Sequence, residues 1–567
     1  MLEIRERDAG GRLGKWFYRG RRITLPALFP VLNPGNVKVH PDEMKKAGCE
    51  VVMVSSFILR KYGERDVHDV LGWDGIVYTD SGTFQMYSVG ISDLDPREVI
   101  EYQERVGSDL ITPLDIFTLP DDSKPVAKEK LEQTLKNVPD REDCVFPIQG
   151  GVYPDLRKKA CEAGRSVSNP VFAIGGIVPL MESYDFKRLA DVVLSCTSSL
   201  PPNKPVHAFG CGHPMIFSLL VAFGCDIFDS AMYALAARRG GYLTASGTKN
   251  LDELREFPCF CPACSKHDVE EVKRMEKPEK EEFLARHNFY VSIQEIKNVR
   301  NAISENRLWE LVQERCRSHP KILEAFEFAL KKYKRFFLKR DPVTKKSAFF
   351  YSGPESKLRP EVIRAKEWSK RVKTKEFVFK KPFGKFPAEL SSVYPFSQSV
   401  VPGEGELSRR WDEKTVRAVL DYQFGEGTGK MVQDLEIEFG RTGRPRKILS
   451  GGEVIGTIRA RDGFFLPTVK GAEMINAKRV EVKEEGVEYV GRGVLARFCK
   501  PLDEILPGEE VAVTFKGRII GVGRSLLNTE EMEVFERGTA VKVRSHVKCE
   551  SCEKPGRGGE NGRKQGF

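Results

Sequence analysis

Aspartates, a glutamine and glycines recur in this chain directly after short apolar runs. In chain order they are Asp80, Asp115, Gln149, Gly175, Gly176, Gly210 and Asp229. Several carboxyl groups in one partly apolar pocket take different pKa values, which separates a nucleophile from a proton carrier. Each position alone is typical of a turn or a helix N-cap, but three converging acids favour a catalytic pocket.

The apolar runs that precede these residues are rich in β-branched and aromatic side chains and predict short strands. They are 51–54, 76–79, 145–148, 171–174, 206–209 and 227–228. Helical stretches lie between them, and one starts at Asp95-Pro96-Arg97-Glu98, which is typical of an N-cap, a first-turn proline and a capping-box glutamate. Alternation of strand and helix favours a parallel sheet. The number of these strand–helix units predicts an α/β fold with a closed (β/α)8 TIM barrel, whose active site forms at the carboxyl ends of its strands.

A second cluster has the composition of a metal site. Cys259, Cys261 and Cys264 supply three thiols, and a histidine, His287 or His267, would complete a Cys3His set that binds zinc in a closed tetrahedron. We favour His287, because His267 follows Cys264 too closely. A closed site leaves no position for water, so we expect one structural Zn²⁺ per chain. A catalytic zinc hydrolase is the alternative.

Composition limits the remaining classes of protein. Apolar residues make up 40% of the 567, which excludes a disordered or fibrous chain. Lys and Arg outnumber Asp and Glu by 91 to 81, and the net charge of +10 is compatible with a polyanionic partner. Most of the 13 cysteines are scattered singly, so no disulfide framework is expected. We find no secretory or membrane segment and predict a cytoplasmic protein with no membrane association.

Two basic segments each allow more than one interpretation. Lys331–Arg340 mixes cations with phenylalanines, and is more typical of a solvated helix face above buried aromatic rings than of a nucleic-acid contact. Residues 548–567 are Gly-rich and basic, which predicts a flexible tail. Cys549 and Cys552 in this tail lack a further ligand pair nearby, so we interpret them as plain thiols rather than half of a metal site.

Several motifs together carry a resemblance. Asp80-Ser81-Gly82-Thr83-Phe84-Gln85, Gln149-Gly150-Gly151 and Phe228-Asp229-Ser230, with the cysteine cluster, resemble tRNA-guanine transglycosylases. Thr83 departs from the bacterial branch, which has Gly there. Two later segments are similar to the archaeal branch, which ends in a PUA domain: Tyr422-Gln423-Phe424-Gly425-Glu426-Gly427 and Pro507-Gly508-Glu509-Glu510-Val511.

The resemblance implies a chain of five parts. A TIM-barrel catalytic domain with the zinc site would span residues 1–345. Small α+β domains would follow at 346–400 and 401–470, and a β-rich, PUA-like RNA-binding domain at 471–547. The flexible tail would complete the chain.

The resemblance also implies an activity, the exchange of guanine in the tRNA D-loop, at the archaeosine site (position 15), for 7-cyano-7-deazaguanine. Replacing a base without cutting the backbone requires attack at ribose C1′, as in retaining glycosidases. Asp229 would form a covalent aspartyl-ribose intermediate and Asp80 would carry the proton, although Asp80 is also chemically acceptable as the nucleophile. The target base must first leave its stack.

The same resemblance implies a set of base-binding residues. Asp115 and Gln149 would hydrogen-bond the guanine edge, and backbone N–H groups near Gly175 and Gly176 would bind its carbonyl. Phe84 would stack on the ring, unless it is a core aromatic. The full set is Ser81, Phe84, Asp115, Gln149, Gly175 and Gly176.

The implied partners are tRNA, the two bases and a second copy of the chain in a homodimer. The adjacent cations Arg238 and Arg239 would hold phosphates, although such a pair is also typical of a solvated loop. Two alternatives to base exchange remain. One is a paralogue resembling archaeosine synthase, which amidates the nitrile of a base already in tRNA. The other is a non-catalytic tRNA-binding protein.

Overall fold

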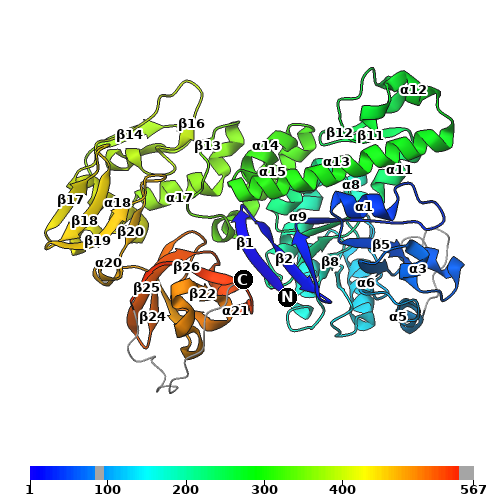
Figure 1. Cartoon of the computed structure of the whole chain (residues 1–567), viewed down its shortest axis with the longest axis horizontal. Coiled ribbons are helices and arrows are strands. Elements are labelled where there is room, and N and C mark those ends of the chain that lie inside the picture. The colour runs from blue at the N-terminus through cyan, green and yellow to red at the C-terminus, as the bar shows by residue number, and fades with distance from the viewer. Residues whose placement is uncertain (84–94, 548–567) are drawn as a thin grey trace, which may run out of the picture.

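The computed structural model describes residues 1–83 and 95–547, and its largest part is a barrel of parallel strands (Figure 1). One sheet has the order β4-β10-β9-β8-β7, and β5 pairs with β6. Parallel bridges Val31–Met53, Tyr78–Leu110 and Ile111–Cys144 join these two sheets through residues 110–111. The ring of eight parallel segments is thereby closed, which confirms the predicted (β/α)8 fold. The strands are β4 (Ala27–Pro30), β5 (Val51–Ser55), β6 (Ile76–Asp80), β7 (Phe146–Ile148), β8 (Phe172–Ile174), β9 (Val206–Ala208) and β10 (Ile227–Ser230).

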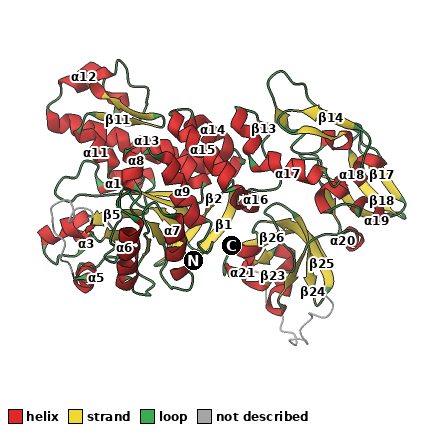
Figure 2. Cartoon of the chain, turned by 180° about the vertical axis from the view of Figure 1, so that it is seen from behind, coloured by secondary structure: helices red, strands yellow, loops and turns green. Residues whose placement is uncertain are grey.

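Helices surround the strands, as the view coloured by secondary structure shows (Figure 2). Helix α5 (Pro96–Arg105) begins as predicted after Asp95, but the Asp95 carboxylate accepts from the N–H of Arg97 rather than closing a capping box with Glu98. The other helices of this region are α1 (Pro41–Ala47), α2 (Ser56–Leu59), α3 (Val67–Leu71), α6 (Lys124–Asn137), α7 (Pro154–Ala163), α8 (Val178–Glu182), α9 (Phe186–Thr197), α10 (Phe217–Ala222) and α11 (Met232–Arg238).

Alternate residues of each strand face the barrel interior, because successive side chains of a strand point to opposite faces. Phe29, Met53, Tyr78 and Ile227 share one buried apolar cluster inside the barrel. Their strand neighbours Leu28, Val52, Val77 and Phe228 belong to a different cluster, which packs against the helices. Asp80 lies two residues beyond Tyr78, and Asp229 two beyond Ile227. Both acids therefore lie on the inward-facing side of their strands, at the strand ends.

The six strands predicted from sequence are all present, within two residues at their ends. Strand β4 and the bridging residues 110–111 were not predicted as strands. An N-terminal antiparallel meander was also missed, because its strands alternate apolar residues with Arg, Lys and Glu instead of forming apolar runs. The meander consists of β1 (Leu2–Asp8), β2 (Gly11–Tyr18) and β3 (Arg21–Leu25).

A group of helices follows the barrel in the chain. The longest, α13 (Lys277–Glu305), is followed by α14 (Leu308–Cys316), α15 (Pro320–Lys332) and α16 (Lys334–Arg340). Phe336 and Phe337 are buried, while Lys332 pairs with Asp191 and Lys339 with Glu530. The two buried rings agree with the prediction, but the segment is divided between α15 and α16, and Arg340 is itself buried rather than solvated. No helix in the described ranges has the length and apolar composition needed to cross a bilayer.

Two further regions complete the described chain. The first has an apolar core distinct from those of the barrel, which Ala512 and Val522 of the second region join. It contains α17 (Pro360–Ser369), α18 (Glu413–Phe424), α19 (Thr428–Met431) and α20 (Val469–Met474), with strands β13 (Phe349–Phe350), β14 (Phe377–Lys380), β15 (Gly384–Pro387), β16 (Ser399–Val400), β17 (Leu435–Phe439), β18 (Pro445–Ser450), β19 (Glu453–Ile458) and β20 (Phe465–Pro467). The second contains α21 (Thr529–Val534) and a six-stranded sheet of β21 (Arg479–Val482), β22 (Val494–Leu495), β23 (Cys499–Pro501), β24 (Glu510–Phe515), β25 (Arg518–Ser525) and β26 (Thr539–His546). The domain boundaries after 345, 400, 470 and 547 stay predictions.

Buried charges join these regions to the meander. Lys345 Nζ lies 2.7 Å from Asp8 of β1, 2.9 Å from Asp341 and 3.0 Å from Glu361 of α17. Arg7 of β1 donates to Glu531 of α21 at 2.6 Å. Removing one member of such a buried set leaves the others without a counter-charge, which is strongly destabilising.

Candidate functional site

The barrel brings the three predicted acids close enough to influence one another. Burial, together with the negative charges of Asp229 and Asp115, raises the pKa of Asp80 to about 7. The N–H of Gly82 donates to Asp80 Oδ1 at 2.6 Å and opposes this effect. Near neutral pH the Asp80 carboxyl group is therefore divided between its protonated and ionised forms, which suits a group that gives and takes a proton.

Asp229 has a different environment. Its Oδ1 accepts a hydrogen bond from the backbone N–H of Gly210 at 2.5 Å and lies 2.8 Å from Nε2 of His207. The side chain is buried at the end of β10. Gly210 was in the predicted set for its position after a strand, whereas His207 was not predicted. The alternation of side chains along the predicted strand 206–209 is the sequence signal that could have found it. His207 lies two residues before Phe209 and therefore on the same face of that strand.

A polar network links Asp115 to the neighbouring strand ends. Asp115 Oδ2 accepts from Gln149 Nε2 at 2.6 Å, and Oδ1 accepts from the hydroxyls of Ser81 and Thr83, both at 3.3 Å. Burial raises the pKa of Asp115 above its ordinary value, and the hydrogen bond from Gln149 opposes that rise. Thr83, the departure from the bacterial motif, is thus a direct partner of the predicted base-binding acid.

The two predicted glycines lie against the same network. A Cβ at Gly175 would come within 2.3 Å of Gln149 Nε2, and one at Gly176 within 3.1 Å of Gln149 Oε1. Gly176 also has a positive φ of 68°, which favours glycine. The N–H of Gly175 donates to Ile148 within the barrel, so Gly175 contributes space, and Gly176 remains the candidate backbone donor. Phe84 lies outside the described residues.

Arg157 is a buried cation behind this pocket that was not predicted. Its Nε donates to the carbonyl of Gly151 at 2.8 Å and its Nη1 to that of Ile148 at 2.5 Å, which holds both ends of the loop bearing Gln149. Gln149 Oε1 and Arg157 Nη2 are both buried without a partner in the described part of the chain. Burial lowers the pKa of Arg157. The pocket thus retains an unused acceptor and an unused donor next to Gly176.

A hollow of about 650 Å³ opens beside the strand ends. It is lined by residues that follow β8, β9 and β10, including Met181, His213, Arg239 and Lys249. Arg238 and Arg239 are exposed, and neither pairs with an acid within the described ranges. These cations are therefore available to a polyanion that enters the rim.

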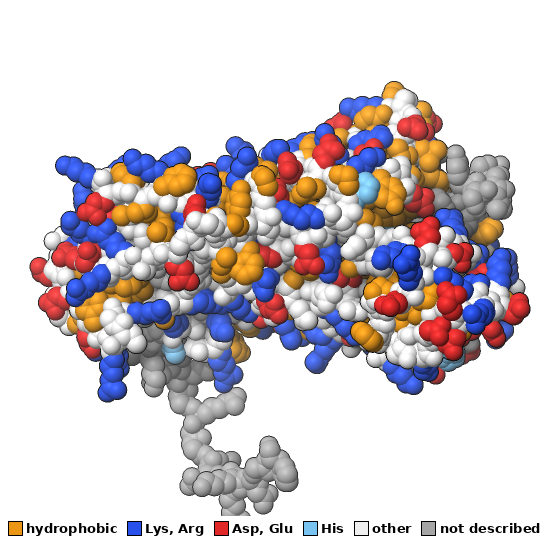
Figure 3. All heavy atoms as spheres, turned by 90° about the horizontal axis from the view of Figure 1, so that it is seen from above, with side chains coloured by type: hydrophobic (Ala, Val, Ile, Leu, Met, Phe, Trp, Pro, Cys, Tyr) orange, Lys and Arg blue, Asp and Glu red, His pale blue; other side chains and the backbone are white. Residues whose placement is uncertain are grey.

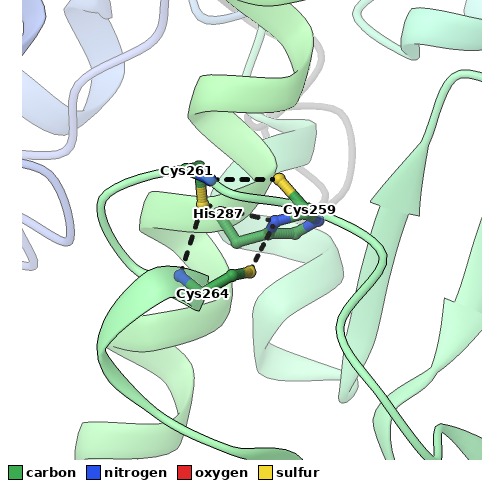
Figure 4. A group of neighbouring side chains, drawn as sticks. All are labelled: Cys259, Cys261, Cys264 and His287. Atoms are coloured by element: carbon green, nitrogen blue, oxygen red, sulfur yellow. Dashed lines mark hydrogen bonds between the residues drawn. The ribbon is translucent and has the colours of Figure 1, made fainter.

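The predicted metal ligands come together in a separate cluster (Figure 4). The ligand atoms of Cys259, Cys261, Cys264 and His287 all lie within 4.8 Å of one another. His287 Nδ1 is 3.3 Å from Cys264 Sγ and 3.7 Å from Cys261 Sγ, close to the separation of about 3.5 to 3.8 Å between neighbouring ligands of a tetrahedral zinc.

The surroundings of His287 favour a ligand at Nδ1. Its Nε2 lies 2.9 Å from the carbonyl of Leu243 and donates to it, which leaves the Nδ1 lone pair facing the thiols. The Tyr242 ring stacks on the imidazole at a centroid distance of 3.5 Å. His267 instead lies beside Glu271 and outside the cluster. His287 rather than His267 thus lies with the three thiols, and the four residues form a set consistent with a metal site.

Comparisons with known proteins agree with this architecture. The family model described as queuine tRNA-ribosyltransferase matches residues 8–321. Models for the C1 domain of tRNA-guanine transglycosylase dimerisation, the patch-forming domain C2 of tRNA-guanine transglycosylase and the PUA domain match residues 342–407, 414–480 and 478–547.

Curated relatives align along nearly the whole chain. The tRNA-guanine(15) transglycosylase of Pyrococcus abyssi is 40% identical over 96% of this chain and 98% of its own length. The proteins of the same name from Thermococcus onnurineus and Methanocaldococcus jannaschii are 41% and 36% identical, each over 96% of this chain and 99% of its own. With these relatives and a family model that matches more than half of its residues, the chain belongs to the tRNA-guanine transglycosylase family.

Proposed function

We propose that this enzyme exchanges guanine at position 15 of tRNA for 7-cyano-7-deazaguanine through a covalent aspartyl-ribose intermediate. The observation that carries the proposal is the convergence of Asp80, Asp115 and Asp229 at one barrel rim, in three different hydrogen-bonding environments. The curated relatives are named for guanine 15.

The first chemical step uses Asp229 and Asp80. A carboxylate oxygen of Asp229 attacks ribose C1′, the C1′–N9 bond breaks, and guanine leaves with a proton from Asp80. In the second step the now ionised Asp80 takes the N9 proton of the incoming base. That base attacks C1′ and releases the Asp229 carboxylate. Two inversions at C1′ retain the configuration. The Asp80 pKa of about 7 supports its proton-carrying role over the role of nucleophile.

The base would bind between Asp115, Gln149 and Gly176. Asp115 is held by three donors and can accept a further N–H from a purine edge. The free Oε1 of Gln149 is a second acceptor. The N–H of Gly176 would donate to the purine carbonyl. Ser81 and Thr83 position Asp115 in this arrangement.

The tRNA would bind to cations near the rim and along the molecule. Arg238 is the last residue of α11, and Arg239 follows it and lines the hollow. The two cations would bind phosphates on either side of the displaced nucleotide. Lys and Arg side chains are spread over the full length of the face seen in Figure 3 rather than gathered at one point. The PUA match at 478–547 adds a module for the same partner.

We also propose a homodimer, supported by the match to the dimerisation domain at 342–407.

We propose that Cys259, Cys261, Cys264 and His287 hold one structural Zn²⁺. Bound zinc would cross-link the loop of residues 259–264 to helix α13. Tyr242 and Leu243, through ring stacking and the bond to His287 Nε2, orient the imidazole for that purpose.

The deciding experiment incubates the enzyme with a tRNA transcript and 7-cyano-7-deazaguanine, and maps the altered nucleotide by mass spectrometry. Incorporation at position 15 with loss of guanine is expected, and radiolabelled guanine should enter the same position. Absence of either exchange under varied salt and temperature would refute the proposal. Formation of archaeosine from tRNA that already holds the nitrile base, with an amine donor, would instead indicate the synthase activity.

A further inference from the structure

His207 is a buried polar residue inside the barrel that the proposed chemistry does not yet use. Its side chain has no exposed surface. Its ring lies among the rings of Phe29, Tyr78 and Phe209, at centroid distances of 6.4, 5.7 and 4.8 Å. Such surroundings hold the imidazole in one orientation, with Nε2 2.8 Å from Asp229 Oδ1 and Nδ1 3.4 Å from the hydroxyl of Tyr78.

With Asp229 ionised, as the proposed nucleophile must be, and His207 neutral, the contacts place the imidazole proton. An ionised carboxylate only accepts hydrogen bonds, so Nε2 must carry the proton that it donates to Asp229. A neutral imidazole then has a lone pair at Nδ1, which requires a donor. Tyr78 supplies one, because burial raises its pKa well above the ordinary value and keeps its O–H protonated. The donor chain runs from Tyr78 to His207 to Asp229.

This series of hydrogen bonds distinguishes the two oxygens of Asp229. Oδ1 receives the Nε2–H of His207 and the N–H of Gly210. Oδ2 accepts no hydrogen bond from any described residue. We propose that His207 is a positioning residue which, oriented by Tyr78, fixes the Asp229 carboxylate so that Oδ2 faces ribose C1′. The inference rests on the proposed role of Asp229 as nucleophile.

The main test compares two single variants in which His207 is replaced by a residue of similar size. His207→Leu keeps the apolar packing but removes the donor, so the carboxylate can rotate. We expect kcat for exchange to fall by about 10²-fold, the effect of a misplaced reacting group, with the KM for 7-cyano-7-deazaguanine and the Kd for tRNA little changed. In His207→Gln the side-chain amide N–H can replace Nε2–H, and most of the lost kcat should return. A merely structural role would not give this split or this rescue.

Tyr78→Phe provides a second test that keeps an aromatic ring in the core. We expect a fewfold fall in kcat in the wild-type background and no further fall in the His207→Leu background, because the hydroxyl acts only through the imidazole. Equal effects of Tyr78→Phe in both backgrounds, or full kcat in His207→Leu, would overturn the inference.

A covalent-trapping arm separates this inference from the proposed function. Denaturing electrophoresis of enzyme with tRNA in the absence of free base should show an adduct, absent in Asp229→Ala. If Asp229→Ala still forms the adduct and exchanges base, the proposed nucleophile is wrong, and the inference falls with it. If Asp229→Ala is inactive but His207→Leu forms adduct at the wild-type rate, only the positioning role of His207 is refuted.

Discussion

The shifted pKa of Asp80 predicts that a conservative substitution stabilises the enzyme while inactivating it. The carboxyl group has a pKa of about 7 in the folded chain against 3.8 in an unfolded one. A raised folded-state pKa means that its contribution to stability is fully present below pH 3.8 and is lost as the pH rises toward 7. Above pH 7 the folded enzyme therefore carries an ionised group that is less well solvated than in the unfolded chain.

The magnitude follows from the two pKa values. At about 1.4 kcal/mol per pKa unit, the difference corresponds to about 4 kcal/mol. Solvent reaches part of the Asp80 side chain, so we take about 2 to 4 kcal/mol as the loss. Asp80→Asn removes the ionisable group and keeps an oxygen that can accept from Gly82. The free energy of unfolding of the variant should exceed that of the wild type by this amount at pH 8, but not at pH 4.

The assay is thermal unfolding of the barrel at pH 4 and pH 8. A domain of this size gains about 2 °C in Tm per kcal/mol, so Asp80→Asn should melt roughly 4 to 8 °C above the wild type at pH 8. Asp121→Asn, at an exposed loop position, is the matched control and should show no pH-dependent difference. A Tm advantage of equal size at both pH values, or a lower Tm at pH 8, would refute the reasoning.

Other perturbations have defined outcomes. Asp229→Asn should lower exchange by about 10⁴-fold with the Kd for tRNA unchanged in a filter-binding assay; retained exchange would contradict the assignment of the nucleophile. Metal analysis should find about one zinc per chain, lost in Cys261→Ala together with solubility, and a fully active metal-free enzyme would argue against the site. Arg157→Leu leaves two loop carbonyls without a donor, at about 1 to 3 kcal/mol each, and should raise the KM for the base more than it lowers kcat; an unchanged KM would count against this role. Lys345→Met should lower the free energy of unfolding by about 3 to 5 kcal/mol, measured by urea denaturation, and a variant of wild-type stability would show that the buried acids tolerate its loss.

The parts of the site predicted from sequence have signals that are local in the chain. Asp80 and Asp229 directly end apolar runs, and Cys259, Cys261 and Cys264 lie within six residues, so type and spacing were informative. Strand β4 was missed, because its parallel partners are β10 and, by a bridge, β5, and the pairing that defines it is not local.

The residues that were missed act through partners distant in sequence. His207 meets Tyr78 across 129 positions and Asp229 across 22. In the sequence, Arg157 looks like any other charged residue of an amphipathic helix. Only the fold shows that its guanidinium donates to the carbonyls at both ends of the loop bearing Gln149. Burial decides the role of both side chains, and burial depends on the closed barrel rather than on the adjacent residues.

The first strand of the chain has consequences for synthesis and folding. Arg7 pairs with Glu531, 524 positions later, and Asp8 with Lys345. During translation β1 leaves the ribosome long before either partner exists, so Asp8 remains unpaired until residue 345 is made and Arg7 until the last module is made. Contacts of such sequence separation form late and slowly. A nascent or prematurely ended chain would therefore present an unfinished edge to chaperones and proteases, and completion of the final module would mark the end of barrel maturation.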